Sequence, residues 1–173
     1  GGLPPDFIHA FNAFSPAGDV TGELVYVNYG RVEDVKELQE LGVSLQGKIA
    51  ISRYGKIFRG NIVANCEAAG AIGVVLYTDP AEVAVQGVNS SQVYPNTFFL
   101  PESGIQRGST FIGDGDPLSP GWPAVPGAYR LGLEDLAREG SLPTIPVQVG
   151  HYTHHITSLA LCPSRLATVT PAA

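Results

Sequence analysis

The stretch between residues 48 and 80 limits the possible folds of this chain more than any other, because it encodes a strand, a helix and a second strand with almost no residues to spare. Ile49 to Ser52 is a short apolar run typical of a strand, and residues 73–77 (GVVLY) are a continuous apolar strand. Between them, apolar residues recur at spacings of three and four, which predicts a helix. Asn61 is a suitable N-cap for this helix and Gly70 a suitable stop. The order of elements predicts a mixed α/β fold.

A second strand and helix precede this unit. Residues 23–28 alternate as a strand does, and a helix is expected to follow directly and to end at Gly42. Its acidic residues, Asp34 among them, are expected to form a solvated face. The apolar stripe that should face the core comprises Val32, Val35, Leu38 and Leu41.

The remaining segments have weaker periodicity. The first twenty residues predict an extended segment, and residues 79–126 predict a long loop rich in proline and glycine, of the length that is usually functional or packs on a neighbour. Residues 127–139 regain a helical pattern. Residues 142–149 predict a strand whose two prolines favour the edge of a sheet. The tail, 151–173, is expected to be weakly ordered.

Composition restricts the class of protein. A length of 173 residues fits one domain, and the net charge of −6 without a basic run argues against a nucleic-acid groove or an anionic membrane surface as partner. No stretch approaches the roughly 20 apolar residues that cross a bilayer, so the chain is expected to be soluble as given and to make no direct membrane contact. Because it contains no methionine, we expect a processed product or a part of a longer protein. The single sequon, at Asn89, favours glycosylation and a secreted or lumenal location.

Most catalytic motifs are missing: the sequence has no G-x-S-x-G, H-E-x-x-H, C-x-x-C, P-loop or G-x-G-x-x-G pattern. Asp114-Gly115-Asp116 resembles the start of a calcium loop without its later positions, so a surface turn is the better interpretation. His151, His154 and His155 could hold a metal, but no acidic third ligand or general base lies near them in the sequence. Cys66 is expected to be a small buried apolar residue.

One short segment is a candidate anion site. Residues 54–60 (YGKIFRG) lead from a strand end to a helix start, where backbone N–H groups and the helix dipole favour an anion, and they contain Lys56 and Arg59. A guanidinium there could bind a carboxylate through two parallel hydrogen bonds. Alternatively, Arg59 could cap a loop or lie over the sheet edge, and the pattern alone leaves both interpretations open.

Several motifs in this chain resemble a known family. The run from Gly47 to Pro80 with its FRGN motif, followed by GIQRGSTF and GDPLSPGWPAVPGAYR, is similar to the protease-associated (PA) domain of the glutamate carboxypeptidase II family, the zinc peptidases of family M28, which also include transferrin receptor. The resemblance covers residues 3–150, and its FRGN and GDPLSPGW motifs are specific enough to indicate the NAALADase-like peptidases. Residues 151–173 diverge from the family pattern. It implies a β-sandwich with flanking helices, inserted into a larger zinc-peptidase domain and acting as a lid over its active site.

The resemblance also implies roles for individual residues. Arg59 would grip the C-terminal carboxylate of a peptide, with Phe58 and Lys56 in the same pocket. Ser109 stands where glutamate-specific members have asparagine, so a preference for glutamate is open. Calcium would take the backbone carbonyls of Ser119 and Trp122, with carboxylates from the peptidase domain.

The resemblance further implies that this chain needs the rest of a longer protein. The zinc ligands and general base of the family lie in the peptidase domain, so this chain is expected to hold no zinc and not to catalyse by itself. Its expected partners are the peptidase and dimerisation domains of a membrane-anchored parent, on the extracellular or lumenal side. The alternative is a non-catalytic interaction and assembly module, as in transferrin receptor.

Overall fold

A computed structural model describes residues 10–132, 134–135 and 142–150. The predictions for residues 1–9, for most of the helix after residue 133, and for the tail with its three histidines and Cys162 concern residues outside these ranges. In chain order the elements are β1 (Asn12–Ala13), β2 (Leu24–Tyr26), α1 (Val32–Glu40), β3 (Ile49–Arg53), α2 (Arg59–Ala68), β4 (Gly73–Tyr77), α3 (Pro80–Val83), the 3-10 helix η1 (Ser90–Gln92), β5 (Gly108–Ser109) and β6 (Val147–Gly150).

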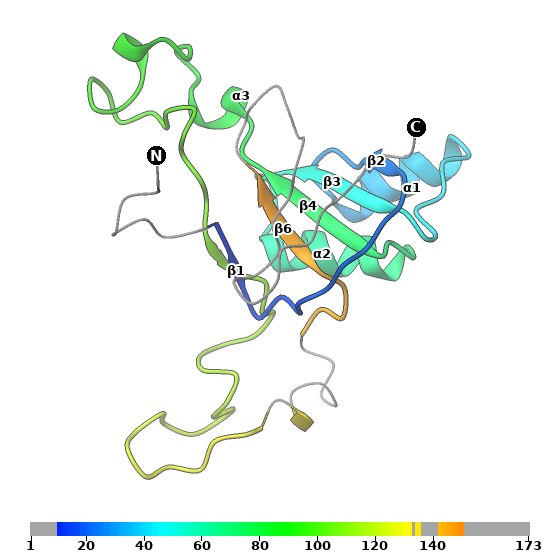
Figure 1. Cartoon of the computed structure of the whole chain (residues 1–173), viewed down its shortest axis with the longest axis vertical. Helices are drawn as coiled ribbons and strands as arrows, with labels where there is room; N and C mark the ends of the chain where they lie inside the picture. The colour runs from blue at the N-terminus through cyan, green and yellow to red at the C-terminus, as the bar shows by residue number, and fades with distance from the viewer. Residues whose placement is uncertain (1–9, 133, 136–141, 151–173) are drawn as a thin grey trace.

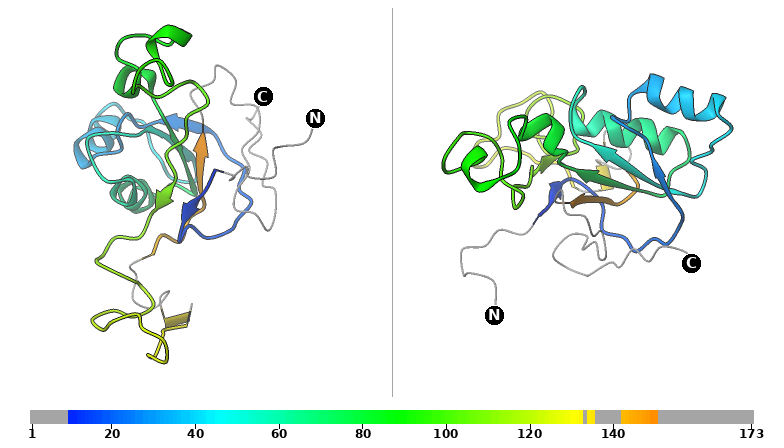
Figure 2. Two further views of the ribbon diagram at one scale, coloured as in Figure 1. Left: turned by 90° about the vertical axis from the view of Figure 1, so that its left-hand side faces the viewer. Right: turned by 90° about the horizontal axis from the view of Figure 1, so that it is seen from above.

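The fold is mixed α/β and is built on parallel pairing. Four strands form one sheet in the order β2-β3-β4-β6, with every neighbouring pair parallel. Helices α1 and α2 connect successive parallel strands, and both cover the same face of the sheet (Figures 1 and 2). This follows from the strand order, since right-handed crossovers that advance in one direction leave their helices on one side. A separate two-stranded parallel ladder joins β1 to β5.

Alternation along the strands separates two layers of apolar contacts. Ala50, Val74 and Leu76 belong to the larger core cluster, which includes Ile62, Val63 and Cys66 from α2. On the other face, Ile49 and Val75 pack with partly buried apolar neighbours, Val20, Ile51 and Ile72. The expectation for Cys66 is confirmed, because it is fully buried and burial raises the pKa of its thiol to about 12. The core therefore lies between the sheet and its two helices.

The helix ends show one correct and one wrong prediction. Gly70 follows α2 with φ +91°, its N–H donates to the Glu67 carbonyl, and the next N–H, of Ala71, donates to the Cys66 carbonyl. This is the Schellman arrangement that a glycine stop favours. Asn61 is not the N-cap. Helix α2 begins at Arg59 with Phe58 in the N-cap position, so the anion-favouring first turn starts at the arginine itself.

Helix α1 differs from its predicted apolar stripe. Val32 and Leu41 are 68% and 71% exposed, whereas Val35 is buried. Asp34, predicted on the solvent face, is also buried. The reason is local: the Asp34 carboxylate satisfies donors from Arg31 and Asn28 at the start of the helix, so its burial is compensated.

The segment predicted as a long loop, 79–126, contains α3, η1 and β5 joined by turns, and parts of it extend away from the sheet (Figure 1). Residues 127–132 are not helical, so the helix predicted from Gly127 does not begin there. Strand β6 is an edge strand, as its prolines predicted. The described residues form one four-stranded sheet and one short ladder, and the β-sandwich implied by the resemblance stays a prediction. Among the described residues, no helix is long and apolar enough to cross a membrane.

Candidate functional site

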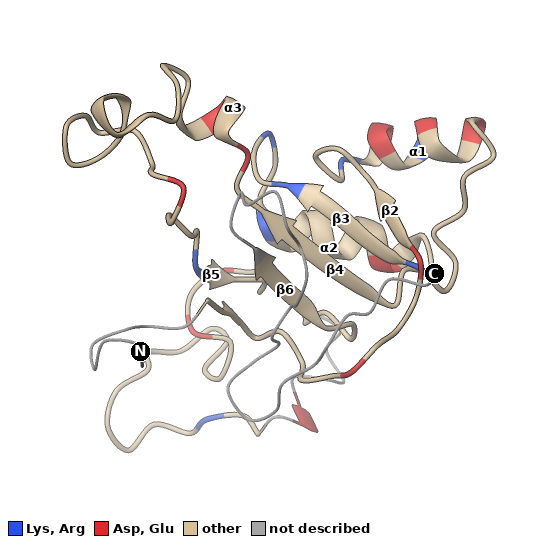
Figure 3. Cartoon of the chain, turned by 45° about the horizontal axis from the view of Figure 1, so that its top comes forward, with Lys and Arg blue, Asp and Glu red and all other residues tan. Residues whose placement is uncertain are grey.

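Basic side chains gather where the parallel strands end. Strand β3 ends at Arg53, and α2 begins six residues later at Arg59. In Figure 3 the basic positions at the end of β3 and at the start of α2 lie at the same end of the sheet. Ligands of open parallel sheets bind at the carboxyl ends of the strands, because the helix N-termini that follow are directed there.

Arg59 is the first residue of α2, and its guanidinium lies against the backbone of β5. A Cβ atom added to Gly108 would collide with the Arg59 guanidinium. The guanidinium carbon also lies 5.5 Å from the centre of the Tyr54 ring and 5.8 Å from that of Phe58. Arg59 is half-buried, and among the described residues no carboxylate forms an ion pair with it. A cation is thus held in place without a counter-charge from the described residues.

Gly60 allows the start of α2 to approach the chain after β5. A Cβ atom there would stand 2.6 Å from the Phe58 ring and 2.6 Å from the Thr110 carbonyl oxygen. Together with Gly108, this glycine brings the FRGN and QRGS motifs into contact. The FRGN motif and the GIQRGSTF run, which are distant in the sequence, therefore form one site.

The surroundings of Arg59 are polar. The Tyr54 hydroxyl donates to the Gln106 carbonyl oxygen over 3.0 Å. Burial raises the pKa of Tyr54, and the nearby Arg59 charge and Asn12 amide oppose that rise. The Nε atom of Arg59 is buried and makes no hydrogen bond in the described structure, and the same holds for both polar atoms of the Asn12 side chain.

Ser109 and Phe58, two of the other predicted site residues, lie beside Arg59. Phe58 is partly exposed, next to the guanidinium. Ser109 adjoins Gly108, and its hydroxyl oxygen accepts the Phe111 N–H over 3.0 Å. Because neighbouring residues of a strand point to opposite faces, the Ser109 side chain is directed away from the face on which the Arg59 guanidinium lies.

Lys56 lies in a different environment. It has φ +64°, and its Nζ stands 5.4 Å from the centre of the Tyr29 ring. The same ring has the Arg53 guanidinium 4.0 Å away and donates its hydroxyl hydrogen to Glu82. Lys56 therefore extends the positive region of the site towards Tyr29 rather than joining Arg59 directly.

The neighbouring arginines are already paired. Arg53 forms an ion pair with Asp79 at 3.3 Å, and Arg31 forms one with Asp34 at 2.9 Å. Burial alone would raise the pKa of Asp34, but hydrogen bonds and charge from Arg31, together with a hydrogen bond from Asn28, lower it. In the part of the chain that the structure describes, Arg59 differs from these two in having no acidic partner.

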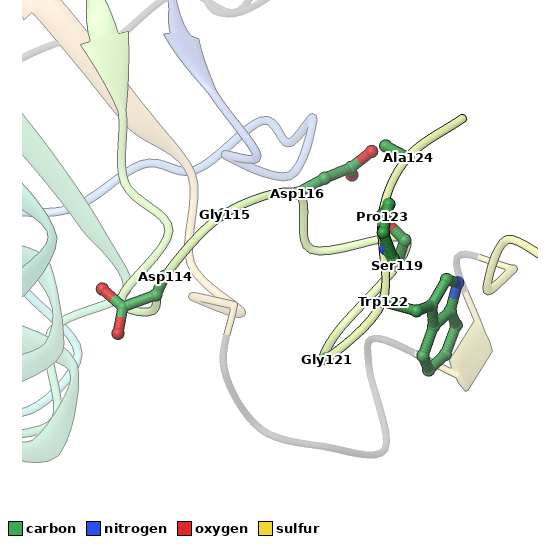
Figure 4. A pocket seen from close by; sticks show the side chains of 8 residues that line it. All are labelled: Asp114, Gly115, Asp116, Ser119, Gly121, Trp122, Pro123 and Ala124. Carbon is green, nitrogen blue, oxygen red and sulfur yellow. The ribbon is translucent and has the colours of Figure 1, made fainter.

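The predicted calcium carbonyls lie in a separate loop. Ser119 and Trp122 line a cavity of about 380 Å³ together with Asp114 and Asp116. The two carboxylates do not converge on a common point (Figure 4), and Asp116 is already paired with Arg130. The Ser119 carbonyl accepts the Trp122 N–H over 3.3 Å. Since calcium takes six to eight oxygens, this loop fits the expected donor type but supplies too few ligands for a calcium site of its own.

Two further findings concern sites outside this region. Asn89, the glycosylation candidate, is exposed at the N-cap position of η1. No group of three or more His, Cys, Asp or Glu residues that could hold a metal occurs among the described residues.

Sequence reasoning missed Asn12. Its strand has only two residues, and its partner strand β5 lies far away in the sequence. Neither periodicity nor a local motif therefore marks Asn12. The only signal was its place between aromatic residues in the segment expected to lie extended over the core.

Comparison with known proteins places the site in a family context. The PA domain profile matches residues 20–110, which include Arg59, Phe58, Lys56 and Ser109. The chain is 44% identical over 146 residues to a glutamate carboxypeptidase 2 homolog of Caenorhabditis briggsae, covering 84% of this chain and 19% of that protein. It is 38% identical over 143 residues to aminopeptidase NAALADL1 of Mus musculus, covering 83% and 19%. It is 42% identical over 137 residues to a probable glutamate carboxypeptidase LAMP1 of Arabidopsis thaliana, covering 79% and 19%. The chain thus spans about a fifth of the length of the curated relatives it matches.

Proposed function

This chain belongs to the PA domain family, and we propose that it is the substrate-gripping lid of a zinc exopeptidase, in which Arg59 binds the C-terminal carboxylate of a peptide. The observation that carries the proposal is the half-buried Arg59 guanidinium, held against Gly108 at the start of α2 without an acidic partner among the described residues.

An unpaired cation in this position is poised for an anion. Partial burial removes water from a guanidinium, and a charge that loses water without gaining a partner is costly. A ligand carboxylate would restore two charge-assisted hydrogen bonds, and the first turn of α2 would add favourable dipole. Removal of one such contact typically costs about 1.5–3 kcal/mol.

The neighbouring residues have supporting roles in this proposal. Phe58 forms an apolar wall beside the guanidinium, and Lys56 adds positive potential from the side of Tyr29. Ser109 affects the site through the β5 backbone on which Arg59 rests. A short hydroxyl at this position, with its oxygen occupied by the Phe111 N–H, gives no dedicated contact for a glutamate side chain, so we propose a broad preference at the terminal residue.

The chemistry itself belongs, in this proposal, to the rest of a longer protein. Zinc bound there would supply an activated water, while this chain orients the peptide terminus and excludes bulk water. The curated relatives named above as carboxypeptidases and aminopeptidases support this reading. We further propose that the Ser119 and Trp122 carbonyls complete a calcium site with carboxylates from the peptidase domain, and that Asn89 carries a glycan on the extracellular or lumenal side.

A second candidate is a non-catalytic interaction module, by resemblance to transferrin receptor. The observation that favours it is the exposed apolar surface between α3 and β5. Phe98 is 87% exposed and Tyr94 68% exposed in this segment. Exposed aromatic side chains grouped in this way mark protein-interaction surfaces in other proteins.

Kinetics on the full-length protein that carries this chain can test the first proposal. Two N-acetyl dipeptides ending in glutamate are compared, one with a free C-terminal carboxylate and one with a carboxamide. Arg59→Ala is expected to raise KM for the free acid by one to two orders of magnitude and to leave the carboxamide nearly unaffected. Arg59→Lys keeps the charge without the fork, so an intermediate loss is expected. Equal kinetics of wild type and Arg59→Ala on both substrates would rule out carboxylate binding by Arg59, which is called the grip below.

A further inference from the structure

Asn12 is the most unusual polar residue near the proposed grip. It is 7% exposed, and neither its Nδ2 nor its Oδ1 atom forms a hydrogen bond in the described structure. A buried carboxamide without partners costs free energy that an apolar residue of similar shape would not. Such a group calls for a functional explanation.

The register of the β1–β5 ladder fixes which way Asn12 points. Asn12 pairs with Gly108, and directly paired residues project from the same face of a ladder. The Arg59 guanidinium occupies the space in front of Gly108 on that face. Asn12 and Arg59 also both interact with the Tyr54 side chain. Three polar groups from β1, α2 and the end of β3 therefore converge.

The unsatisfied atoms are chemically complementary. The Nε–H of Arg59 is a buried donor without an acceptor, and Oδ1 of Asn12 is a buried acceptor without a donor. Tyr54 uses its hydroxyl hydrogen on the Gln106 carbonyl, which leaves the oxygen free to accept the Asn12 Nδ2–H. Arg59 and Tyr54 therefore offer the Asn12 carboxamide one donor and one acceptor.

We propose that Asn12 is the positioning residue of Arg59, an inference that rests on the proposed function. When a carboxylate binds the two Nη groups, Asn12 Oδ1 accepts the Arg59 Nε–H, and Asn12 Nδ2 donates to Tyr54. The guanidinium plane is then fixed and its fork faces the ligand. Because asparagine is neutral, it orients the arginine without competing for its charge, as an aspartate in the same place would.

Two variants of Asn12 distinguish a positioning role from a purely structural one by their effect on ligand binding. Asn12→Asp keeps the shape and the acceptor but adds a carboxylate that pairs with Arg59. Asn12→Leu keeps the approximate volume and removes two unsatisfied polar atoms. If Asn12 only filled space, Asn12→Leu would bind ligand as the wild type does.

The experiment uses the full-length protein and the same pair of acetylated dipeptides, free acid and carboxamide. Carboxylate selectivity is the ratio of kcat/KM for the free acid to that for the carboxamide. Asn12→Leu is expected to lower this ratio about tenfold through KM of the free acid, with thermal stability unchanged or raised. Asn12→Asp is expected to lower the ratio further, because its carboxylate competes with the ligand for Arg59.

The matched control is Asn65→Leu, which removes the hydrogen bond from Asn65 Nδ2 to the Gly30 carbonyl oxygen (2.9 Å). This control should lower stability and leave the ratio unchanged.

The outcomes separate this inference from the proposed function. If Asn12→Leu retains wild-type selectivity while Arg59→Ala loses it, the role of Asn12 is overturned and the carboxylate-binding role of Arg59 stands. The role is also overturned if the Asn12 variants slow both substrates equally, since that is the signature of a structural residue. If Arg59→Ala retains selectivity, the grip itself is wrong. Should Asn12→Leu fail to fold, the smaller Asn12→Ala, which also removes the acceptor without adding a charge, decides in its place.

Discussion

Three arginines lie near the carboxyl end of the sheet, and their partners distinguish them. Arg31 and Arg53 each have an aspartate within ion-pair distance, whereas Arg59 has aromatic rings and a glycine. A paired guanidinium has little left to offer a ligand, since a second anion would have to displace the first or repel it. At the scale of single residues, the site is therefore defined by Arg59, the one of these three arginines that has no ion pair among the described residues.

Gly108 is predicted to be essential for the grip, because the guanidinium lies where a side chain would stand. Gly108→Ala should displace Arg59 and lower carboxylate selectivity about tenfold or more, as expected for loss of a charge-assisted contact. Kinetics with the free-acid and carboxamide substrates measure this. Gly132→Ala is the matched control, since a Cβ there comes no closer than 3.6 Å to another residue. Unchanged selectivity in Gly108→Ala would contradict the geometry of Arg59.

Asp34 is predicted to contribute stability that depends on pH. Its pKa is lowered in the folded chain, so its contribution is present above the ordinary carboxyl pKa and is lost as pH falls from that value towards the lowered one. Asp34→Asn should cost about 1–3 kcal/mol at neutral pH. The difference between wild type and variant should shrink below about pH 4. Urea unfolding from pH 7 to pH 2.5 checks this, and a gap independent of pH would refute the assignment.

At the scale of elements, helix α2 links the core to the site. Its buried face packs on the sheet, its first residue is Arg59, and Gly60 lets its first turn approach the Thr110 backbone. The position of the guanidinium therefore depends on how the helix is seated. The short β1–β5 ladder serves the same end from the other side, because Gly108 supports the guanidinium and Asn12 lies beside it.

The two glycines that end α1 and α2 are predicted to differ in importance. Gly42 and Gly70 both have positive φ, 78° and 91°, which an alanine tolerates poorly. A Cβ at Gly42 meets nothing, whereas one at Gly70 collides with the Gln46 side chain. We expect Gly42→Ala to destabilise by about 1 kcal/mol and Gly70→Ala by more, measured by chemical unfolding. An equal loss of unfolding free energy in the two variants would show that the Gln46 side chain moves away from the added methyl group of Gly70→Ala without cost, which would contradict the prediction.

The sequence allowed the central elements to be predicted and left the long-range contacts open. Strands β3 and β4 and the stop at Gly70 follow from runs of apolar residues and from glycine chemistry, which are local. The start of α2 was placed three residues late, because Asn61 is a better capping residue than Phe58 in isolation. Burial of Asp34 could not be foreseen, since it depends on donors from Arg31 and Asn28 folding onto it. Arg59 was found through its motif, but its contact with Gly108 and the convergence with Asn12 require a ladder between distant segments.

At the scale of the whole molecule, the site occupies one end of the sheet, and separate loops extend from it. The surface between α3 and β5, with Tyr94 and Phe98, and the cavity near Ser119 and Trp122 lie in different segments from Arg59. A lid domain needs one surface for its ligand and others for the protein that it covers. The separation of the Arg59 site from the other two surfaces is compatible with a lid.

The exposed aromatic side chains are predicted to be separable from the grip. Replacing Tyr94 and Phe98 together by serine should change the free energy of unfolding by less than about 0.5 kcal/mol, because both side chains are mostly exposed. Carboxylate selectivity should also stay at the wild-type value. Calorimetry and kinetics test these two points, while sedimentation of the full-length protein reports on assembly. Loss of assembly with intact selectivity would support an additional interaction role, and loss of selectivity would contradict the separation.

The central claim is that Arg59 binds a peptide carboxylate, and a crystal structure of the full-length protein with a bound free-acid peptide analogue tests it most directly. We predict both carboxylate oxygens about 2.7–2.9 Å from the Arg59 Nη atoms, as in charge-assisted pairs. A carboxylate bound by other residues, with Arg59 still resting on Gly108 and out of reach, would contradict the account.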